Sequence, residues 1–143
     1  YFGIYDGQAH AATATVTGVG GLSAQLVSST THTNAGVYSD TVTFVGDANH
    51  KAASKTVKSY ILQASVTITG DGLNGSGYFG IYDGQAHAAT ATVTGVGVNG
   101  VNGVIAQLTS TTHTDAGVYS DTVTFLGDAN HKVTSKVVKS YII

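Results

Sequence analysis

The 143-residue chain contains no cysteine, proline, tryptophan, methionine, arginine or glutamate. Without cysteine it can form neither a disulfide nor a thiolate metal site, and it has no thiol nucleophile. Only 10% of the residues are charged and the formal net charge is −2, so no basic surface for phosphates is predicted and nucleic acid is not an expected partner. The apolar runs are far shorter than the ~20 residues of a membrane helix, and we expect no membrane span.

Apolar residues at the 3.6-residue spacing of a helix are also missing, whereas alternation with a period of two is frequent. In the run His113–Phe125, Tyr119, Val123 and Phe125 share one parity, and Ser and Thr occupy much of the other. Such alternation of aromatic and β-branched residues with hydroxyl residues is typical of a half-buried strand. The sequence therefore predicts an all-β protein.

The sequence contains an internal repeat with two nearly identical copies. Residues 1–20 return unchanged as residues 78–97, and His32–Phe44 returns as His113–Phe125 with a single change, Asn34 to Asp115. The second copy carries a longer glycine-rich stretch, residues 98–104, which predicts a hairpin loop. We place the boundary at Gln63, which gives one repeat over residues 1–62 and a second over residues 63–143.

Short strands separated by turn signals predict a β-sandwich in each copy. The strands expected in the complete second copy cover residues 65–69, 80–82, 87–96, 105–109, 118–126 and 135–142. The first copy begins at the counterpart of Tyr78, so we expect it to lack its own first strand. Neither a signal peptide nor a start outside the repeat is visible, and the sequence is expected to belong to a longer chain.

Three residues in each copy, a glycine, a tyrosine and a phenylalanine, are predicted to stabilise its sandwich. Tyr38 and Tyr119 follow a turn and enter a strand, which predicts a tyrosine corner whose hydroxyl bonds back to the preceding loop. Tyr5 and Tyr82 are likewise expected to pack. Phe44 and Phe125 end the apolar parity of the same strands. Gly36 and Gly117 are expected to supply the positive φ of the turn.

The motifs Tyr82-Asp83-Gly84-Gln85-Ala86, Thr114-Asp115-Ala116-Gly117-Val118-Tyr119 and Gly127-Asp128-Ala129-Asn130-His131, with their copies, resemble the MBG-type and immunoglobulin-like repeats of large bacterial surface proteins. The resemblance implies two tandem Ig-like β-sandwiches that serve as spacer or stalk segments, without catalytic residues. Asp40 and Asp121 depart from it, because they occupy the apolar parity of their strand. A β-bulge would restore the alternation.

Residues with reactive side chains are interpreted as structural. The six histidines lie in separate segments without metal-ligand spacing, and a zinc or copper site between copies is the alternative. Asp47 and Asp71 are expected to cap turns, with weak calcium binding as the alternative. Lysines in the last strand of each copy, Lys55, Lys58, Lys136 and Lys139, are expected to protect a sheet edge, with an isopeptide bond to Asp40 or Asp121 as the alternative.

Taken together, the sequence predicts a non-enzymatic structural module without cofactor or metal. We expect it to extend an extracellular filament or cell-surface adhesin stalk by end-to-end stacking, with neighbouring copies of the repeat as partners. The missing strand of copy one is expected to be supplied by a preceding segment or by a neighbouring chain. The rival hypothesis is a carbohydrate- or protein-binding module that uses loop aromatics such as Phe79 and Tyr82.

Overall fold

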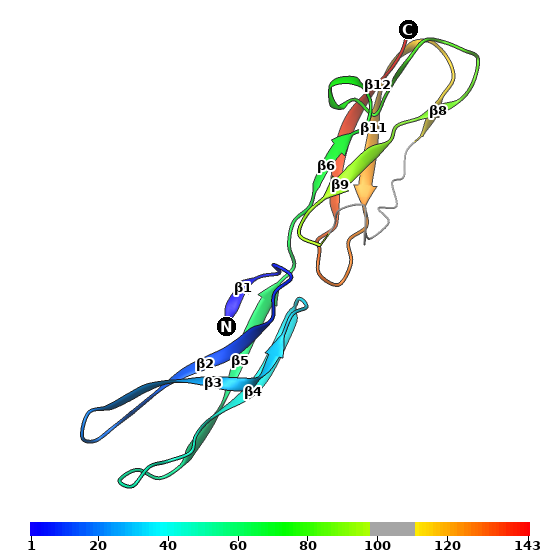
Figure 1. Ribbon diagram of the computed structural model, residues 1–143. Helices are drawn as coiled ribbons and strands as arrows, with labels where there is room; N and C mark the ends of the chain where they lie inside the picture. Colours follow the sequence, from blue (N-terminus) through cyan, green and yellow to red (C-terminus); the bar gives the residue numbers. More distant parts are fainter. Residues whose placement is uncertain (98–110) are drawn as a thin grey trace. The chain divides into compact units, whose positions relative to one another are not determined.

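The computed structural model describes residues 1–97 and 111–143 (Figure 1). The inserted stretch at residues 98–104 and the strand expected at residues 105–109 lie outside the described residues. The described part is all-β, apart from one 3-10 turn, η1 (Leu73–Gly75). The chain divides into two compact units, unit 1 (Tyr1–Gln63) and unit 2 (Ala64–Ile143).

Unit 1 is built from two antiparallel hairpins. Its strands are β1 (Phe2–Ile4), β2 (His10–Gly18), β3 (Leu22–His32), β4 (Gly36–Phe44) and β5 (Ala53–Leu62). One sheet has the order β1-β5-β4, in which β1 runs parallel to β5, and the other is the hairpin β2-β3. The ladder of β2 and β3 is continuous except for a shift between Ala11 and Thr13.

Unit 2 repeats this plan with an additional first strand. Its strands are β6 (Thr67–Gly70), β7 (Tyr78–Gly80), β8 (His87–Ala88), β9 (Ala91–Thr94), β10 (Thr112–His113), β11 (Gly117–Phe125) and β12 (Thr134–Ile142). The order β7-β12-β11 reproduces that of β1-β5-β4. Strand β6 pairs with β9 inside unit 2, in an antiparallel ladder with Ile68 opposite Val93.

The predicted bulge in the strand that carries Asp40 or Asp121 is wrong. Strands β4 and β5 pair without a shift from Gly36 to Phe44, and β11 and β12 pair without a shift from Gly117 to Phe125. Asp121 therefore stays on the inner parity of its strand, where it is 2% exposed. The alternation is kept because hydrogen-bond donors surround the carboxylate.

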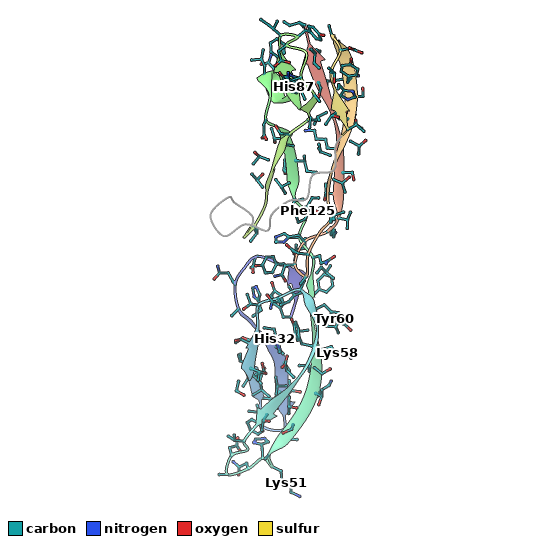
Figure 2. All side chains as sticks on the ribbon, turned by 90° about the vertical axis from the view of Figure 1, so that its right-hand side faces the viewer. His32, Lys51, Lys58, Tyr60, His87 and Phe125 are labelled. Carbon is teal, nitrogen blue, oxygen red and sulfur yellow. The ribbon has the colours of Figure 1, made fainter. Side chains whose placement is uncertain are left out.

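The core of unit 2 lies between its two layers. It joins apolar side chains from β6, β9, β11 and β12 and from two residues outside the strands, Val66 and Ala89. The full set is Val66, Ile68, Ala89, Ala91, Val93, Val123, Phe125 and Val138. In β12, Val138, Ser140 and Ile142 point inward and alternate with outward residues. In unit 1, Lys58 and Tyr60 lie on the outward face of β5 (Figure 2).

Two local expectations need correction. The strand expected at residues 80–82 lies at Tyr78–Gly80, so Tyr82 follows it and remains 53% exposed rather than packed. The single strand expected at residues 87–96 is divided into β8 and β9. Between β8 and β9, the Thr90 amide donates to the Gly77 carbonyl at 2.9 Å. This bond interrupts the strand, so that β8 pairs with β10 and β9 pairs with β6.

The two copies of the core phenylalanine allow a direct stability test. Phe125 is 1% exposed, whereas its counterpart Phe44 is half-buried. We expect Phe125→Ala to destabilise unit 2 by about 3–5 kcal/mol, as for other buried phenylalanines, and Phe44→Ala to destabilise unit 1 by only about 1–2 kcal/mol. Amide hydrogen exchange in β11 and β4 reports each unit separately. Equal losses would show that the two sites are equally buried.

Candidate functional site

Every histidine of the described chain is paired with an aspartate, although the sequence suggested six isolated residues. In each unit two of the pairs lie within a turn, and one joins a strand end to the middle of another strand. The Nε2–Oδ1 pairs are His10–Asp6, His32–Asp40, His87–Asp83 and His113–Asp121, and the Nδ1–Oδ1 pairs are His50–Asp47 and His131–Asp128, all at 2.7–2.9 Å.

The carboxylate of Asp121 is the most completely enclosed polar group of this set. Its Oδ1 accepts from Thr111 Oγ1 at 2.7 Å and contacts His113 Nε2 at 2.7 Å, while its Oδ2 accepts from Ser140 Oγ at 2.8 Å. Burial raises the pKa of Asp121, but the bonds from His113, Thr111 and Ser140 outweigh it and leave the pKa below its ordinary value. The charged form is therefore the one that the fold favours.

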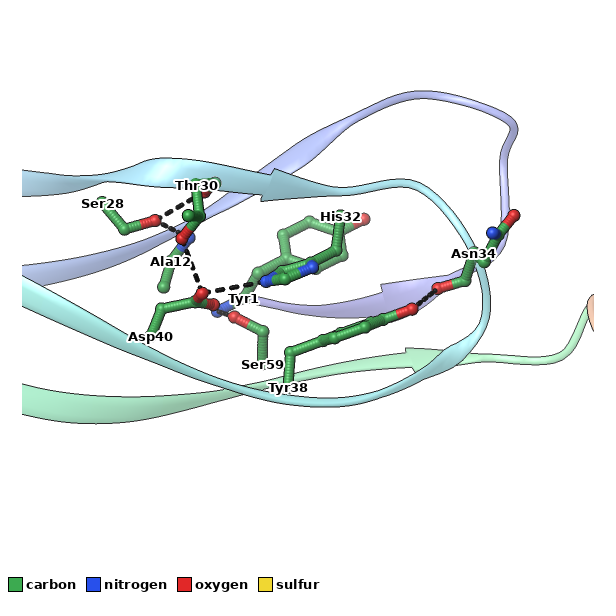
Figure 3. Close-up of polar contacts among 9 residues, drawn as sticks. All are labelled: Tyr1, Ala12, Ser28, Thr30, His32, Asn34, Tyr38, Asp40 and Ser59. Atoms are coloured by element: carbon green, nitrogen blue, oxygen red, sulfur yellow. Dashed lines mark hydrogen bonds and ion pairs between the residues drawn. The ribbon is translucent and has the colours of Figure 1, made fainter.

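Unit 1 holds the same cluster with one difference (Figure 3). Asp40 Oδ1 contacts His32 Nε2 at 2.9 Å and accepts from Thr30 Oγ1 at 2.7 Å, and these bonds, led by that from His32, lower the pKa of Asp40. Its Oδ2 is buried without a hydrogen-bond partner among the described residues. The counterpart of Ser140, Ser59, instead accepts from the amino group of Tyr1 at 3.3 Å.

A tyrosine ring covers the imidazole of each cluster. The rings of His32 and Tyr38 are stacked with centroids 3.8 Å apart, and those of His113 and Tyr119 likewise. The Tyr38 hydroxyl donates to the Asn34 carbonyl, and the Tyr119 hydroxyl to the Asp115 carbonyl, each at 2.8 Å. These are the bonds expected of a tyrosine corner.

Gly36 and Gly117 serve the tyrosine rings in a way the sequence did not suggest. Neither residue has a positive φ, so the predicted role in a left-handed turn is wrong. A Cβ atom at Gly117 would lie 3.0 Å from the hydroxyl oxygen of Tyr119, and a Cβ atom at Gly36 would lie equally close to that of Tyr38. The glycines therefore leave room for the ring to fold back over the strand start.

A second histidine lies beside each cluster. His10 and His32 are opposite one another in the β2–β3 ladder, as are His87 and His113 in the β8–β10 ladder. His10 stacks on Tyr1 with centroids 4.0 Å apart, and His87 stacks on Tyr78 at 4.2 Å. Asp83 accepts from the Gln85 amide and contacts His87, so the Asp-Gly-Gln-Ala-His run forms a turn that presents the imidazole to the tyrosine.

The third pair ties the far end of the β4–β5 hairpin to the β2–β3 hairpin. His50 Nδ1 contacts Asp47 at 2.8 Å, and its Nε2 lies 2.8 Å from the Val19 carbonyl oxygen. His131 bridges Asp128 and the Val96 carbonyl in the same way. The bond to the Val19 carbonyl and then that to Asp47 raise the pKa of His50, because both favour the protonated ring.

The conformation of the Gly-Asp-Ala-Asn-His loop at residues 46–50 depends on its glycine and its aspartate. Gly46 has a φ of 87°, and a Cβ atom there would lie 2.9 Å from backbone atoms of the following turn. Asp47 accepts from the amides of Asn49 and His50 at 2.8 and 2.7 Å. Glycine and aspartate thus shape the turn so that the histidine can reach the other hairpin.

None of these pairs has the arrangement of a hydrolytic triad. In such a triad the imidazole nitrogen opposite the carboxylate faces a nucleophile. Here the hydroxyl groups of Thr111 and Thr30 donate to the carboxylate itself, and Ser39 lies on the exposed face of β4. Within residues 1–97 and 111–143, no group of three histidine, cysteine or acidic side chains is placed to hold a metal ion.

The remaining alternatives from the sequence meet competing contacts. The Asp47 carboxylate accepts from the amides of its own turn, as the expected capping requires. Asp71 instead accepts from Thr92 Oγ1 of β9 at 2.6 Å, so its carboxylate bonds to another strand rather than capping a turn. Lys139 Nζ donates to Ser120 Oγ and Lys136 Nζ to the Ile68 carbonyl. Their amino groups are therefore directed away from the buried Asp121, and the geometry gives no support to an isopeptide bond.

Exposed aromatic side chains form a separate feature on the outer face of each unit. Phe2 lies near Tyr60 with ring centroids 6.3 Å apart, and Phe79 lies near Tyr141 at 6.1 Å. Phe79 is 45% exposed and borders a groove of about 380 Å³ that Tyr141 and Lys139 also line. The ring of Tyr1, by contrast, stacks on the imidazole of His10.

Comparison of the chain with protein-family models, curated proteins and solved structures found no match. The described residues include no helix with the length and hydropathy required to cross a bilayer.

The paired histidines were missed by reasoning from sequence, although two signals pointed to them. Asp6–His10 and Asp47–His50 are spaced so that a single turn can bring them together, and both spacings recur in the second copy. Asp40 and Asp121 on an apolar parity require a donor when buried. Lysine and histidine are the only cations this sequence offers, and histidine is the one short enough to remain inside a small sandwich.

The Asp121 cluster predicts a graded response to two substitutions. Asp121→Ala removes the acceptor of three donors in a buried site, and we expect unit 2 to lose about 3 kcal/mol or more. Asp121→Asn keeps an oxygen for Thr111 and His113, and Ser140 can turn to accept, so its loss should be under half as large. Urea unfolding monitored by tyrosine fluorescence and by exchange of the β11 amides tests this order. The reverse order would mean that the negative charge matters more than the bonds.

The His–Asp pairs also predict the pH dependence of stability. The raised pKa of His50 stabilises the fold below the ordinary value of 6.5, and this effect is lost as the pH rises through the folded-state pKa. The lowered pKa of Asp47 acts in the opposite sense, because its stabilisation is present above 3.8 and is lost as the pH falls through the folded-state pKa. Unit 1 should therefore be most stable at mildly acidic pH. An NMR titration should give His50 a pKa above 6.5, and His50→Gln should flatten the alkaline side of the profile.

Proposed function

We propose that the chain is a structural repeat module made of two tandem Ig-like β-sandwiches, which extends an extracellular filament or an adhesin stalk. The observation that carries this proposal is the use of the same histidine, aspartate and tyrosine residues in both units to bond the fold to itself. Groups that could do chemistry are engaged in holding hairpins together, and they recur at matching places. Repetition of a self-bonded unit is what a spacer requires.

The connection between the units supports the same proposal. Strand β5 ends at Leu62, and Ala64 is already buried in unit 2. Only Gln63 separates the last strand of one unit from the first buried residue of the next. A connection this short adds little length between folded units, which suits a stalk whose length grows with the number of copies.

A second function is favoured by the exposed aromatic pairs. Phe2 with Tyr60 and Phe79 with Tyr141 lie at matching places, and Phe79 and Tyr82 are largely solvent-exposed. Aromatic faces on a sandwich surface suit stacking against sugar rings or apolar side chains. In this alternative the module binds a carbohydrate or protein, and the repeat serves avidity rather than length.

Concatenation of the whole chain distinguishes the two functions. We expect chains of one, two and four copies of residues 1–143 to show a maximum dimension, measured by small-angle X-ray scattering, that rises linearly with copy number. A dimension that levels off would contradict the stalk. Binding to a glycan array that disappears in Phe79→Ala, while the His–Asp pairs and the fold are retained, would instead support the binding module.

A further inference from the structure

The two units have nearly the same core sequence but not the same burial. Val93, Phe125 and Val138 are at most 7% exposed in unit 2, whereas their counterparts Val16, Phe44 and Val57 in unit 1 are half-buried. His131 has a side chain 3% exposed, against 25% for His50. Because the residues are identical, something present in unit 2 and absent from unit 1 must account for the difference.

One such element is the segment Ala64–Gly70. Val66 and Ile68 belong to the buried core of unit 2. The Ala64 amide donates to the Asn130 carbonyl at 2.8 Å and the Lys132 amide donates to the Ala64 carbonyl at 2.9 Å. The segment therefore closes one side of the unit with both apolar contacts and backbone bonds.

Unit 1 has a groove at the corresponding place. It measures about 610 Å³ and lies between the β2–β3 turn and the far end of the β4–β5 hairpin, and its lining includes Val16, Phe44, Asn49, His50 and Lys51. Val16 and Phe44 correspond to core residues that unit 2 buries. Asn49 and Lys51 correspond to Asn130 and Lys132, which bond Ala64 in unit 2.

The edge of β2 that borders this groove is the one a further strand would need. Strand β3 takes one edge of β2 and lies beside β4, where Thr30 bonds Asp40. Strand β6 lies beside β12, the counterpart of β5, where Lys136 Nζ donates to the Ile68 carbonyl. A counterpart of β6 in unit 1 would therefore lie on the edge of β2 that is opposite to β3. Among the described residues, no strand pairs with that edge at residues 14–17.

We propose that this groove and the free edge of β2 form an acceptor site for one extended strand of the Ala64–Gly70 type. Its register follows from unit 2, where Ile68 faces Val93 and Gly70 faces Ala91, so the incoming residues face Val16 and Ala14. The strand alternates small or branched apolar residues, which enter the groove, with Ser and Thr, which face solvent. Its occupant is a segment joined ahead of Tyr1, as Ala64–Gly77 is joined ahead of Tyr78.

Delivery from the N-terminal side follows from the geometry of unit 2. After β6 the chain turns through η1 and returns to β7, where the Gly77 amide donates to the Lys139 carbonyl at 2.7 Å. Its counterpart would be the Lys58 carbonyl of β5. A segment entering this way reaches the groove without displacing any strand of unit 1, whereas a second copy would have to release its own β6 and lose the contacts of Val66 and Ile68. The proposal rests on the groove and stands whether or not the module is part of a stalk.

The test joins residues Ala64–Gly77 directly ahead of Tyr1 in the full chain. We expect amide exchange at residues 14–17 to slow at least tenfold, the His50 imidazole signals to shift towards those of His131, and the unfolding midpoint of unit 1 to rise. The matched control carries V66D and I68D in the grafted segment only, which keeps length and turn but places charges in the groove. The control should leave exchange and the midpoint of unit 1 at the values of the original chain.

Three outcomes would overturn the proposal. If neither the graft nor a free peptide of residues 64–77 slows exchange at residues 14–17, the groove is not an acceptor. If the charged control protects as well as the graft, the apolar pockets do not recognise the strand. If the unmodified chain forms head-to-tail oligomers in sedimentation analysis and the graft abolishes them, the occupant is a second copy and the assignment to a segment ahead of Tyr1 is wrong.

Discussion

The hydrogen bond between a buried aspartate and a histidine under a tyrosine ring is the interaction on which each unit depends. The buried apolar residues are mostly alanine and valine, and Phe125 is the one phenylalanine among those described, so apolar burial contributes less than in a domain rich in leucine and isoleucine. Hydrogen bonds to charged groups contribute roughly 1.5–3 kcal/mol each. By joining the end of β3 or β10 to the middle of β4 or β11, the His–Asp bond links the two layers of the unit. The carboxylate also fixes which way β11 faces, since a shift of one residue would turn Asp121 outward and its neighbour Ser120 or Thr122 inward.

The sequence was sufficient for the all-β class and for most of the strand positions, because period-two alternation and an almost unchanged repeat are strong local signals. It was insufficient where partners come from distant segments. Asp121 on an apolar parity suggested a bulge, and only the three-dimensional meeting with Thr111, His113 and Ser140 explains why the ladder needs none. Gly117 was assigned to positive φ on its position after an Asp-Ala pair, whereas its role depends on the ring of Tyr119 folding back over it. Contacts between segments that are distant in the sequence leave no periodic pattern from which they could be predicted.

The duplicated sequence also works as an internal control on burial. Where identical residues differ in exposure between the units, the cause must lie in what surrounds them. Phe44 and Phe125 end equivalent strands, yet Phe125 is enclosed in a core to which Val66 and, from β6, Ile68 contribute. A polar consequence accompanies the apolar one, since His50 remains partly open to water and His131 does not. The segment Ala64–Gly70 therefore contributes to the environment of His131 at the far end of unit 2.

This dependence bears on how a repeat of this type would carry load. The backbone leaves unit 1 at Leu62 and becomes part of unit 2 at Ala64, whose amide and carbonyl both bond to the loop before β12. Tension in the connection would act first on these two bonds and on the insertion of Val66, and only then on the β6–β9 ladder. The apolar side chains of β6 resist withdrawal because each must leave a closed core, with a cost near 25 cal/mol per Å² exposed. In a stalk of the kind proposed, the segment Ala64–Gly70 would be both the closing element of unit 2 and its mechanical attachment, and both roles would use its alternation of apolar and hydroxyl residues.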